Sequence, residues 1–399
     1  DHRRRLPGRE CEAGAAARKK ASGIPEGSVS RTAATGGIET RRGQSLDRQI
    51  KSGKSQWEER MNRREALALM GGLSMTAFLP TLARADTKNI KLGYNVATLA
   101  NPFFQGMTKG VVDAAAKYPN ITLINTNANG DANTQSTMVV DLINQGVDAL
   151  ILNPINANSI VPVVEQANKK NIPVFTLDRG AAGGDTVNFL ETDNVALGRE
   201  GAQFILDKLK ARYGKIQGNV VDLVGLIGTT AGDDRDKGFT EVFNKAAGEN
   251  PDLKLVARQE GKFDQETSFN LMSQIMAANP QIDAVFNGND DNAVGALRAI
   301  RQASKNTPLD DPKHIIVIGI DGTAQALTAI RKGDMDATLS QNPLTMASQS
   351  VKYVDQYFNG DKGSIPKHEF WPHILLTKDN IDGDEVKKYG LWAEEVAKG

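Results

Sequence analysis

Cysteine is nearly absent from this chain of 399 residues. The only one is Cys11, so residues 86–399 contain no thiol and form no disulfide. Histidine is also scarce, and its four positions lack the spacing of metal ligands and belong to no nucleophile–base motif. They are His2, His314, His368 and His373. The shortage of both residue types argues against metal-dependent or nucleophilic catalysis, and we expect neither a metal nor a cofactor.

A long uninterrupted hydrophobic run is lacking as well. The most apolar stretch, 66–82, is broken by two glycines, a serine and a proline, which makes it a poor permanent membrane span. It follows Met61 and the basic segment 62–65, and it precedes the small-x-small segment 83–85. This order predicts a signal peptide over 61–85, cleaved after Ala85, and export to the periplasm.

Two further features bear on this export prediction. No cysteine follows the apolar stretch, which excludes a lipoprotein anchor, and the Arg63-Arg64 pair leaves the twin-arginine and general secretion routes both open. Residues 1–60 are rich in Arg, Gly, Ser and Ala and show no periodicity. We interpret 1–60 as a non-native, disordered upstream extension and Met61 as the true start. The alternative is a disordered basic tail on a cytosolic protein.

An excess of positive charge is missing from the part of the chain that remains after cleavage. Residues 1–85 hold 17 of the 48 basic residues and 9 of the 48 acidic residues, so residues 86–399 hold 31 basic and 39 acidic residues, a net charge of about −8. Recognition of phosphate backbones requires a basic face. The sequence therefore predicts no nucleic-acid partner.

What the chain does contain, after Asp86, is a regular alternation of short strands and amphipathic helices. The strands are rich in Val, Ile and Leu, which is typical of a parallel sheet covered on both faces. In the first half the expected strands are 90–96, 121–125, 149–152, 172–177 and 187–190, and the expected helices are 105–117, 134–145 and 159–170. In the second half the expected strands are 219–226, 253–259, 284–286, 315–320, 337–340 and 373–377, and the expected helices are 194–212, 236–247, 267–278, 293–304 and 384–398.

Two successive units of this kind predict an α/β protein with two doubly wound lobes. Ligands of open parallel sheets bind beyond the carboxyl ends of the strands. Polar and aromatic residues recur at those ends: Asn101, Phe103, Phe104, Asn153, Asp178, Arg179, Arg235, Phe263, Asn289, Asp321 and Gln341. Each alone is explained as a turn, a helix cap or core, but their recurrence in both units indicates one shared site for a polar ring.

Several motifs together carry a resemblance to a known family. They are Asn101-Pro102-Phe103-Phe104, Leu152-Asn153-Pro154, Thr176-Leu177-Asp178-Arg179, Phe263-Asp264, Asn289-Asp290, 295–299 (GALRA), 319–323 (GIDGT) and Gln341. From about Ile90 to about Leu376 the chain resembles the periplasmic sugar-binding proteins of ABC transporters, specifically the ribose-binding branch related to the LacI-type repressor core.

The resemblance implies a type I periplasmic binding protein, with two Rossmann-like parallel-sheet lobes joined by a three-segment hinge. It implies that the eleven residues above bind a monosaccharide, with Phe103, Phe104 and Phe263 sandwiching the ring and the polar groups taking hydroxyls. We expect a first lobe of 86–192 plus 342–372, a second lobe of 193–341 plus 373–399, and crossings near 192–194, 341–343 and 371–373. One departure is Ala97, where ribose binders often have a small hydroxyl residue.

The function that follows is that of the solute-binding component of an ABC importer. A monomer closes on ribose or a similar pentose and presents the closed form to permease subunits in the inner membrane. A hexose, a polyol or an autoinducer-2-like furanose is the alternative ligand, and a chemoreceptor is left open as a second partner. An Asp178–Asp321 glycosidase pair is disfavoured because both carboxylates stand with arginines. A repressor is disfavoured because it needs a helix-turn-helix ahead of Ile90, where residues 61–85 instead form an export signal.

Overall fold

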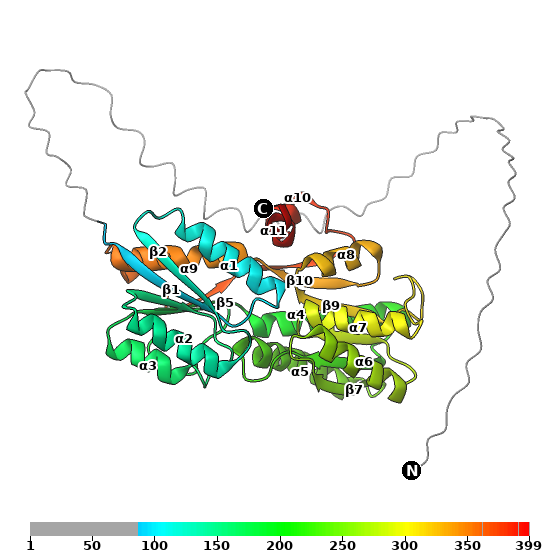
Figure 1. The fold of residues 1–399 in the computed structure, drawn as a ribbon. Helices are drawn as coiled ribbons and strands as arrows, with labels where there is room; N and C mark the ends of the chain where they lie inside the picture. The colour runs from blue at the N-terminus through cyan, green and yellow to red at the C-terminus, as the bar shows by residue number, and fades with distance from the viewer. Residues whose placement is uncertain (1–86, 361, 390, 399) are drawn as a thin grey trace, which may run out of the picture. The chain divides into compact units, whose positions relative to one another are not determined.

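The computed structural model describes residues 87–360, 362–389 and 391–398, and these form two lobes around two six-stranded sheets (Figure 1). The predicted extension 1–60 and signal peptide 61–85 lie outside the described residues. No helix in the described part is long and apolar enough to cross a membrane.

The first sheet is entirely parallel and has the strand order β11-β5-β4-β3-β1-β2. Its strands are β1 (Ile90–Val96), β2 (Ile121–Asn127), β3 (Ala149–Leu152), β4 (Val174–Leu177), β5 (Asn188–Thr192) and β11 (His368–Trp371). Its helices are α1 (Pro102–Ala115), α2 (Ala132–Asn144), α3 (Val161–Lys169) and α9 (Pro343–Phe358). Helices α1 and α9 cover one face of the sheet, and α2 and α3 cover the other (Figure 1).

The second sheet has the order β12-β10-β9-β8-β6-β7, and only β12 runs antiparallel to its neighbour. Its strands are β6 (Gly218–Val224), β7 (Leu253–Glu260), β8 (Ala284–Asn287), β9 (Ile316–Asp321), β10 (Ala337–Gln341) and β12 (His373–Thr377). Its helices are α4 (Asn194–Tyr213), α5 (Thr230–Glu249), α6 (Gln265–Ala278), α7 (Asp290–Gln302) and α8 (Ala324–Lys332). A short 3-10 turn, Lys362–Ser364, precedes β11.

The central strands are buried on both faces, as their apolar composition requires. Every residue of β3, β4, β8 and β9 is buried, so these strands form the centre of each lobe. Side-chain oxygens cap the helices that follow the strands, including Asn101 before α1 and Asn289 before α7. Capping therefore fixes one predicted site residue at the carboxyl edge of each sheet.

The chain passes between the two sheets at three places: from β5 to α4, from β10 to α9, and from β11 to β12. This is the three-segment connection of the predicted fold class. Strand β11 was not expected from the sequence, because its four residues alternate between exposed and half-buried positions and give no apolar run.

Several predicted boundaries are wrong. Helix α1 begins at Pro102 rather than 105, because Asn101 caps it and Pro is favoured in the first turn. Helix α5 begins at Thr230 rather than 236, so Arg235 lies in its second turn, not at its start.

The C-terminal helix expected over 384–398 is two short helices, α10 (Asp384–Tyr389) and α11 (Trp392–Lys398). Its apolar residues were expected to pack on the second lobe. Tyr389 is instead 56% exposed, and Trp392 packs against α1 of the first lobe.

Candidate ligand-binding site between the lobes

A small cavity lies where the carboxyl edges of the two sheets meet. Nine of the eleven predicted residues line it, together with Ala231: Asn101, Phe103, Phe104, Asp178, Arg179, Arg235, Phe263, Asn289 and Asp321. The two others do not line it. Asn153 and Gln341 lie behind it and hydrogen-bond to Asp178 and Asp321. The fold thus brings all eleven to one place, from both lobes.

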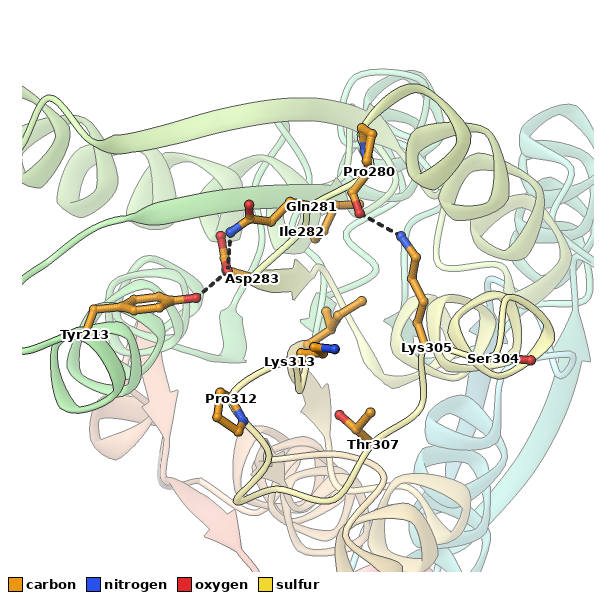
Figure 2. A pocket seen from close by; sticks show the side chains of 11 residues that line it. Tyr213, Pro280, Gln281, Ile282, Asp283, Ser304, Lys305, Thr307, Pro312 and Lys313 are labelled. Atoms are coloured by element: carbon orange, nitrogen blue, oxygen red, sulfur yellow. Dashed lines mark hydrogen bonds between the residues drawn. The ribbon is translucent and has the colours of Figure 1, made fainter.

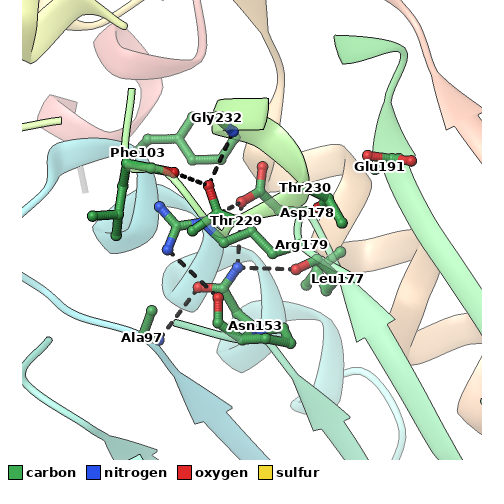
Figure 3. A network of polar contacts seen from close by, with 12 residues as sticks. Ala97, Phe103, Asn153, Leu177, Asp178, Arg179, Glu191, Thr229, Thr230 and Gly232 are labelled. Atoms are coloured by element: carbon green, nitrogen blue, oxygen red, sulfur yellow. Dashed lines mark hydrogen bonds and ion pairs between the residues drawn. The ribbon is translucent and has the colours of Figure 1, made fainter. Parts of the chain in front are cut away.

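In the first lobe, Asn153 organises the polar groups (Figure 3). Its Nδ2 donates to the Leu177 carbonyl at 3.0 Å and to Oδ2 of Asp178 at 3.3 Å. Its Oδ1 accepts the backbone N–H of Ala97 at 3.3 Å. The position that departs from the family pattern is therefore buried and holds Asn153 through its backbone, independently of its side chain.

In the second lobe, Asp321 has the corresponding central place. Its carboxylate accepts hydrogen bonds from Gln341 Nε2 at 2.7 Å and from Asn289 Nδ2 at 3.3 Å. A guanidinium nitrogen of Arg235 lies 3.9 Å from Oδ1 of Asp321. Arg235 also donates to Oδ1 of Asn194 and to the Gly288 carbonyl, both at 2.8 Å. These two hydrogen bonds fix the orientation of the side chain and use two of its five N–H donors.

The aromatic side chains surround a guanidinium. The Arg179 guanidinium carbon lies 4.9 Å from the ring centroid of Phe104 and 5.5 Å from that of Phe263. Phe103 meets Phe104 edge to face, with centroids 5.8 Å apart. Rings from both lobes thus face a shared centre, and Arg179 is the group between Phe104 and Phe263 in this structure.

Burial perturbs the charged groups of this site. Burial raises the pKa of the Asp178 carboxyl, and the guanidinium groups of Arg179 and Arg235 only partly oppose it. Burial likewise raises the pKa of Asp321 well above its ordinary range, against the effect of Arg235. Burial lowers the pKa of Arg179 to about 10. Paired carboxylates and guanidinium groups taken out of water are strong hydrogen-bonding partners for a polar ligand.

Two carboxylates at the site have an unusual backbone. Asp178 has φ of 66° and Asp321 has φ of 128°, and Phe263 also has a positive φ of 57°. Residues other than glycine adopt such values at a cost of roughly 1–3 kcal/mol, and they are common at ligand-binding positions. The surrounding hydrogen bonds hold these side chains in directions that ordinary strand geometry does not provide.

The lobes also contact each other directly. Asn101 of the first lobe donates to Asp291 of the second at 2.7 Å, and both side chains are buried. The Gly180 N–H donates to the Thr230 hydroxyl at 3.1 Å, and the Ala157 N–H donates to the Gly228 carbonyl at 3.0 Å. Sequence reasoning missed Asp291, although it directly follows the Asn289-Asp290 motif.

The free volume of this cavity is about 20 Å³, room for little more than one water molecule. A larger cavity of about 310 Å³ lies elsewhere in the second lobe, lined by Tyr213, Asp283 and Lys305 among others (Figure 2). It is a weaker candidate because it lies at the amino ends of β8 and β9. Its one buried carboxylate, Asp283, already accepts hydrogen bonds from Tyr213 and from the backbone of Asn219. In the described part of the chain, no group of three metal-ligating side chains is found.

Comparison with known proteins places this geometry in a family. Residues 92–362 match the family described as "Periplasmic binding protein domain". The chain belongs to the periplasmic binding protein family. The ribose import binding protein of Bacillus subtilis (strain 168) is 35% identical over 277 residues, which are 69% of this chain and 84% of that protein.

Two further relatives of this periplasmic binding protein show the range of the family. The xylitol-binding protein of Mycolicibacterium smegmatis is 33% identical over 322 residues, 79% of this chain and 86% of that protein. An ABC transporter solute binding protein from Bacillus halodurans C-125, solved with bound myo-inositol, superposes with a TM-score of 0.67. It is 28% identical, and the match covers 76% of this chain and 99% of that one.

These relationships confirm the predicted fold class, the two-lobed type I periplasmic binding protein. The chain is a periplasmic, sugar-binding component of an ABC transporter and not an enzyme.

Proposed function

We propose that this periplasmic binding protein binds one monosaccharide between its lobes, with ribose or a similar pentose as the preferred ligand, and delivers it in the closed form to an inner-membrane permease. The observation that carries the proposal is the convergence of two carboxylate–guanidinium sets, one per lobe, on a cavity walled by aromatic rings. The curated relative with 35% identity is a ribose import binding protein, which favours a pentose.

The polar groups suit hydroxyls because one buried N–H donor among the lining residues makes no hydrogen bond in the described structure. Arg179 Nε is buried and has no hydrogen-bond partner among the described residues. A sugar hydroxyl that accepts from this N–H and donates to the Asp178 carboxylate satisfies both groups, each charge-assisted bond contributing about 1.5–3 kcal/mol net. A sugar lacking that hydroxyl leaves a buried group unpaired, which is the source of selectivity.

The small cavity implies motion. About 20 Å³ of free space admits no sugar, so the ligand enters when the lobes separate at the three connections, or when Arg179 moves from between the rings. Ligand that contacts both sets of residues stabilises the closed form, because only that form makes both sets of contacts. The closed form is then what the permease recognises.

The alternative ligands are a hexose, a polyol or an autoinducer-2-like furanose. A specific observation supports the polyol alternative: a relative with 33% identity is a xylitol-binding protein, and a structural neighbour holds myo-inositol. Ala97 bears on the choice, because ribose binders often have a small hydroxyl residue at this position, which here lies beside Asn153 and does not line the cavity. A role in chemotaxis is a further alternative and depends on a chemoreceptor.

A thermal-shift scan of the full-length chain tests the proposal. The protein is unfolded, stripped of bound solutes and refolded, and its Tm is measured with D-ribose, D-allose, xylitol, myo-inositol and autoinducer-2. A ligand at 100 times its Kd adds about 2.7 kcal/mol to stability, which raises Tm by several degrees. A rise with D-ribose supports the pentose, a rise with another compound alone changes the ligand, and no rise with any compound contradicts the sugar site.

A further inference from the structure

The C-terminal segment 379–398 extends beyond the last strand and has no part in the site described so far. Within it, Trp392 is only 2% exposed, although it opens the short terminal helix α11. In Figure 1 this helix lies between α1 of the first lobe and α8 of the second. The terminal residues are therefore held at the junction of the lobes.

Trp392 contacts one ligand-site residue from each lobe without lining the cavity. Its indole N–H donates to the backbone carbonyl of Asp321, with Nε1 and O 2.8 Å apart. Its ring meets that of Phe103 edge to face, with centroids 6.0 Å apart and planes at 90°. One side chain thus contacts the backbone of Asp321 in the second lobe and the ring of Phe103 in the first.

The packing around the indole shows that this contact is close. A Cβ placed on Gly106 of α1 would lie 2.7 Å from Cζ3 of Trp392 and 3.3 Å from Cγ of Pro343. Only glycine lets the indole lie against α1 at this depth. Pro343, which opens α9 directly after the second connection between the lobes, also lies beside Gly106.

The segment itself is fastened to the second lobe. Arg331 of α8 forms ion pairs with Asp382 at 3.1 Å and with Glu394 at 2.8 Å. These pairs are partly exposed and weak individually, but they flank Trp392 in sequence on both sides. Trp392 is therefore carried by the second lobe and reaches the first lobe only when the two are together.

The indole hydrogen bond acts on a strained residue. Asp321 has φ of 128°, and its carboxylate is shared among Asn289, Gln341 and Arg235. A donor fixed on its carbonyl limits rotation of this peptide, and so directs the carboxylate towards the cavity. Loss of the donor leaves a buried carbonyl without that bond.

We propose that Trp392 is a positioning residue for the sugar site: it holds Phe103 and Asp321 in their ligand-facing arrangement and stabilises the closed lobes, so that it slows release of bound sugar. The proposal rests on the function proposed above and extends the site to the C-terminal segment. The indole touches no ligand itself and acts through the two residues that do.

The test measures by stopped-flow fluorescence how fast the full-length chain releases a bound sugar. The probe is the one of the five compounds in the thermal-shift scan that raises Tm most. Trp392→Phe keeps a ring against Phe103 and removes the donor to Asp321. We expect it to raise koff by about 5- to 10-fold, with kon little changed and the Tm of ligand-free protein lowered by a few degrees, because the buried Asp321 carbonyl loses its donor. Trp392→Ala removes both contacts, and we expect a larger rise in koff.

Trp371→Phe is the matched control. The indole N–H of Trp371 donates to the Thr345 hydroxyl at 3.1 Å, so this variant also loses one indole hydrogen bond. Trp371 on β11 and Thr345 on α9 both belong to the first lobe. We expect its koff to equal that of wild type.

The outcomes separate this inference from the proposed function. Wild-type protein that binds sugar while Trp392→Phe releases it at the wild-type rate overturns the role of Trp392 and leaves the sugar site standing. An equal rise of koff in the Trp371→Phe control also overturns it, because the effect is then not specific to the lobe-bridging indole. Wild-type protein that binds none of the five compounds overturns the proposed function, and this inference with it.

Discussion

The buried side chain of Arg235 connects the ligand site to the first place where the chain crosses between the lobes. Its guanidinium donates to Asn194, next to the first connection, and to the Gly288 carbonyl, and it lies 3.9 Å from Asp321. Removing one partner of such a network leaves the others buried and unpaired, which costs more than the net contribution of one hydrogen bond. Among the site residues, we therefore expect substitutions of Arg235 and Arg179 to weaken sugar binding most.

We expect Arg235→Ala and Arg179→Ala each to weaken sugar binding by about tens-fold, roughly 2 kcal/mol or more. Isothermal titration calorimetry with the sugar found in the thermal-shift scan measures this. Arg298→Ala is the control, because Arg298 is partly exposed and pairs with Glu266 away from the cavity. Near-normal affinity in both site variants would contradict the assignment of the site without affecting the fold.

At the scale of elements, two features determine how the two lobes contact each other: the close packing of helices and the strands at the crossings. Helix α1 carries Asn101, Phe103 and Phe104 at its start, and it packs against α9 and α11. Strand β5 ends at the first crossing and carries Glu191, which is 4% exposed. Each of these elements gives a prediction about stability.

Two glycines in helices test the packing of α1. Gly106→Ala places a Cβ 2.7 Å from Trp392, whereas a Cβ on Gly248 in α5 meets nothing within 4 Å. Alanine stabilises a free helical position by about 0.5–1 kcal/mol relative to glycine. We expect Gly248→Ala to raise Tm and Gly106→Ala to lower it, measured by calorimetry of the ligand-free protein. A rise of the same size in both would show that the indole does not lie against Gly106.

Glu191 makes the first crossing sensitive to pH. Its two carboxylate oxygens lie 3.0 Å from Asn194 Nδ2 and 2.9 Å from His368 Nε2. Burial raises its pKa to about 8, and the hydrogen bond from Asn194 only partly opposes this. The nearby carboxylates Asp234, Asp178 and Asp193 raise the pKa further. Glu191 therefore binds its proton more tightly in the folded protein than in the unfolded chain, where its pKa is ordinary.

It follows that the proton on Glu191 stabilises the fold at low pH, and that this stability is lost as pH rises towards and through about 8. We expect a loss on the order of 2 kcal/mol from this group between about pH 5 and pH 8. Glu191→Gln, which mimics the neutral carboxyl, should flatten the dependence of Tm on pH. Glu200→Gln is the control, because the Glu200 carboxylate also meets a histidine, His373, but is 41% exposed. Equal pH profiles for wild type and Glu191→Gln would contradict this.

At the scale of the whole molecule, cleavage on export determines which part of the chain reaches the periplasm. We expect the exported protein to begin at Asp86, because Ala83-Arg84-Ala85 fits the cleavage pattern and β1 begins four residues later, at Ile90. Mass spectrometry of protein from the periplasmic fraction measures the N-terminus. A start before residue 61 would overturn both the signal peptide and the proposed start at Met61.

Much of the architecture could be predicted because strands and caps are local. The bounds of β1 and β3 agree with the apolar runs that predict them, since a strand buried on both faces is necessarily apolar. Contacts between residues far apart in the chain leave no such pattern in the local sequence. Strand β11 joins the edge of the first sheet with only half-buried and exposed residues, and the partner of Asn101, Asp291, is 190 residues away.

By itself, then, the sequence determined the two α/β units and the positions at the strand ends where polar and aromatic residues gather, because both follow from periodicity and from the geometry of parallel sheets. Only the tertiary structure decided how these positions face each other: Arg179 between rings of two lobes, Asn153 and Gln341 behind the cavity, and Trp392 across the junction. The reason is physical. Such contacts join residues far apart in the chain, and their directions depend on packing, burial and strained backbone that no local pattern records.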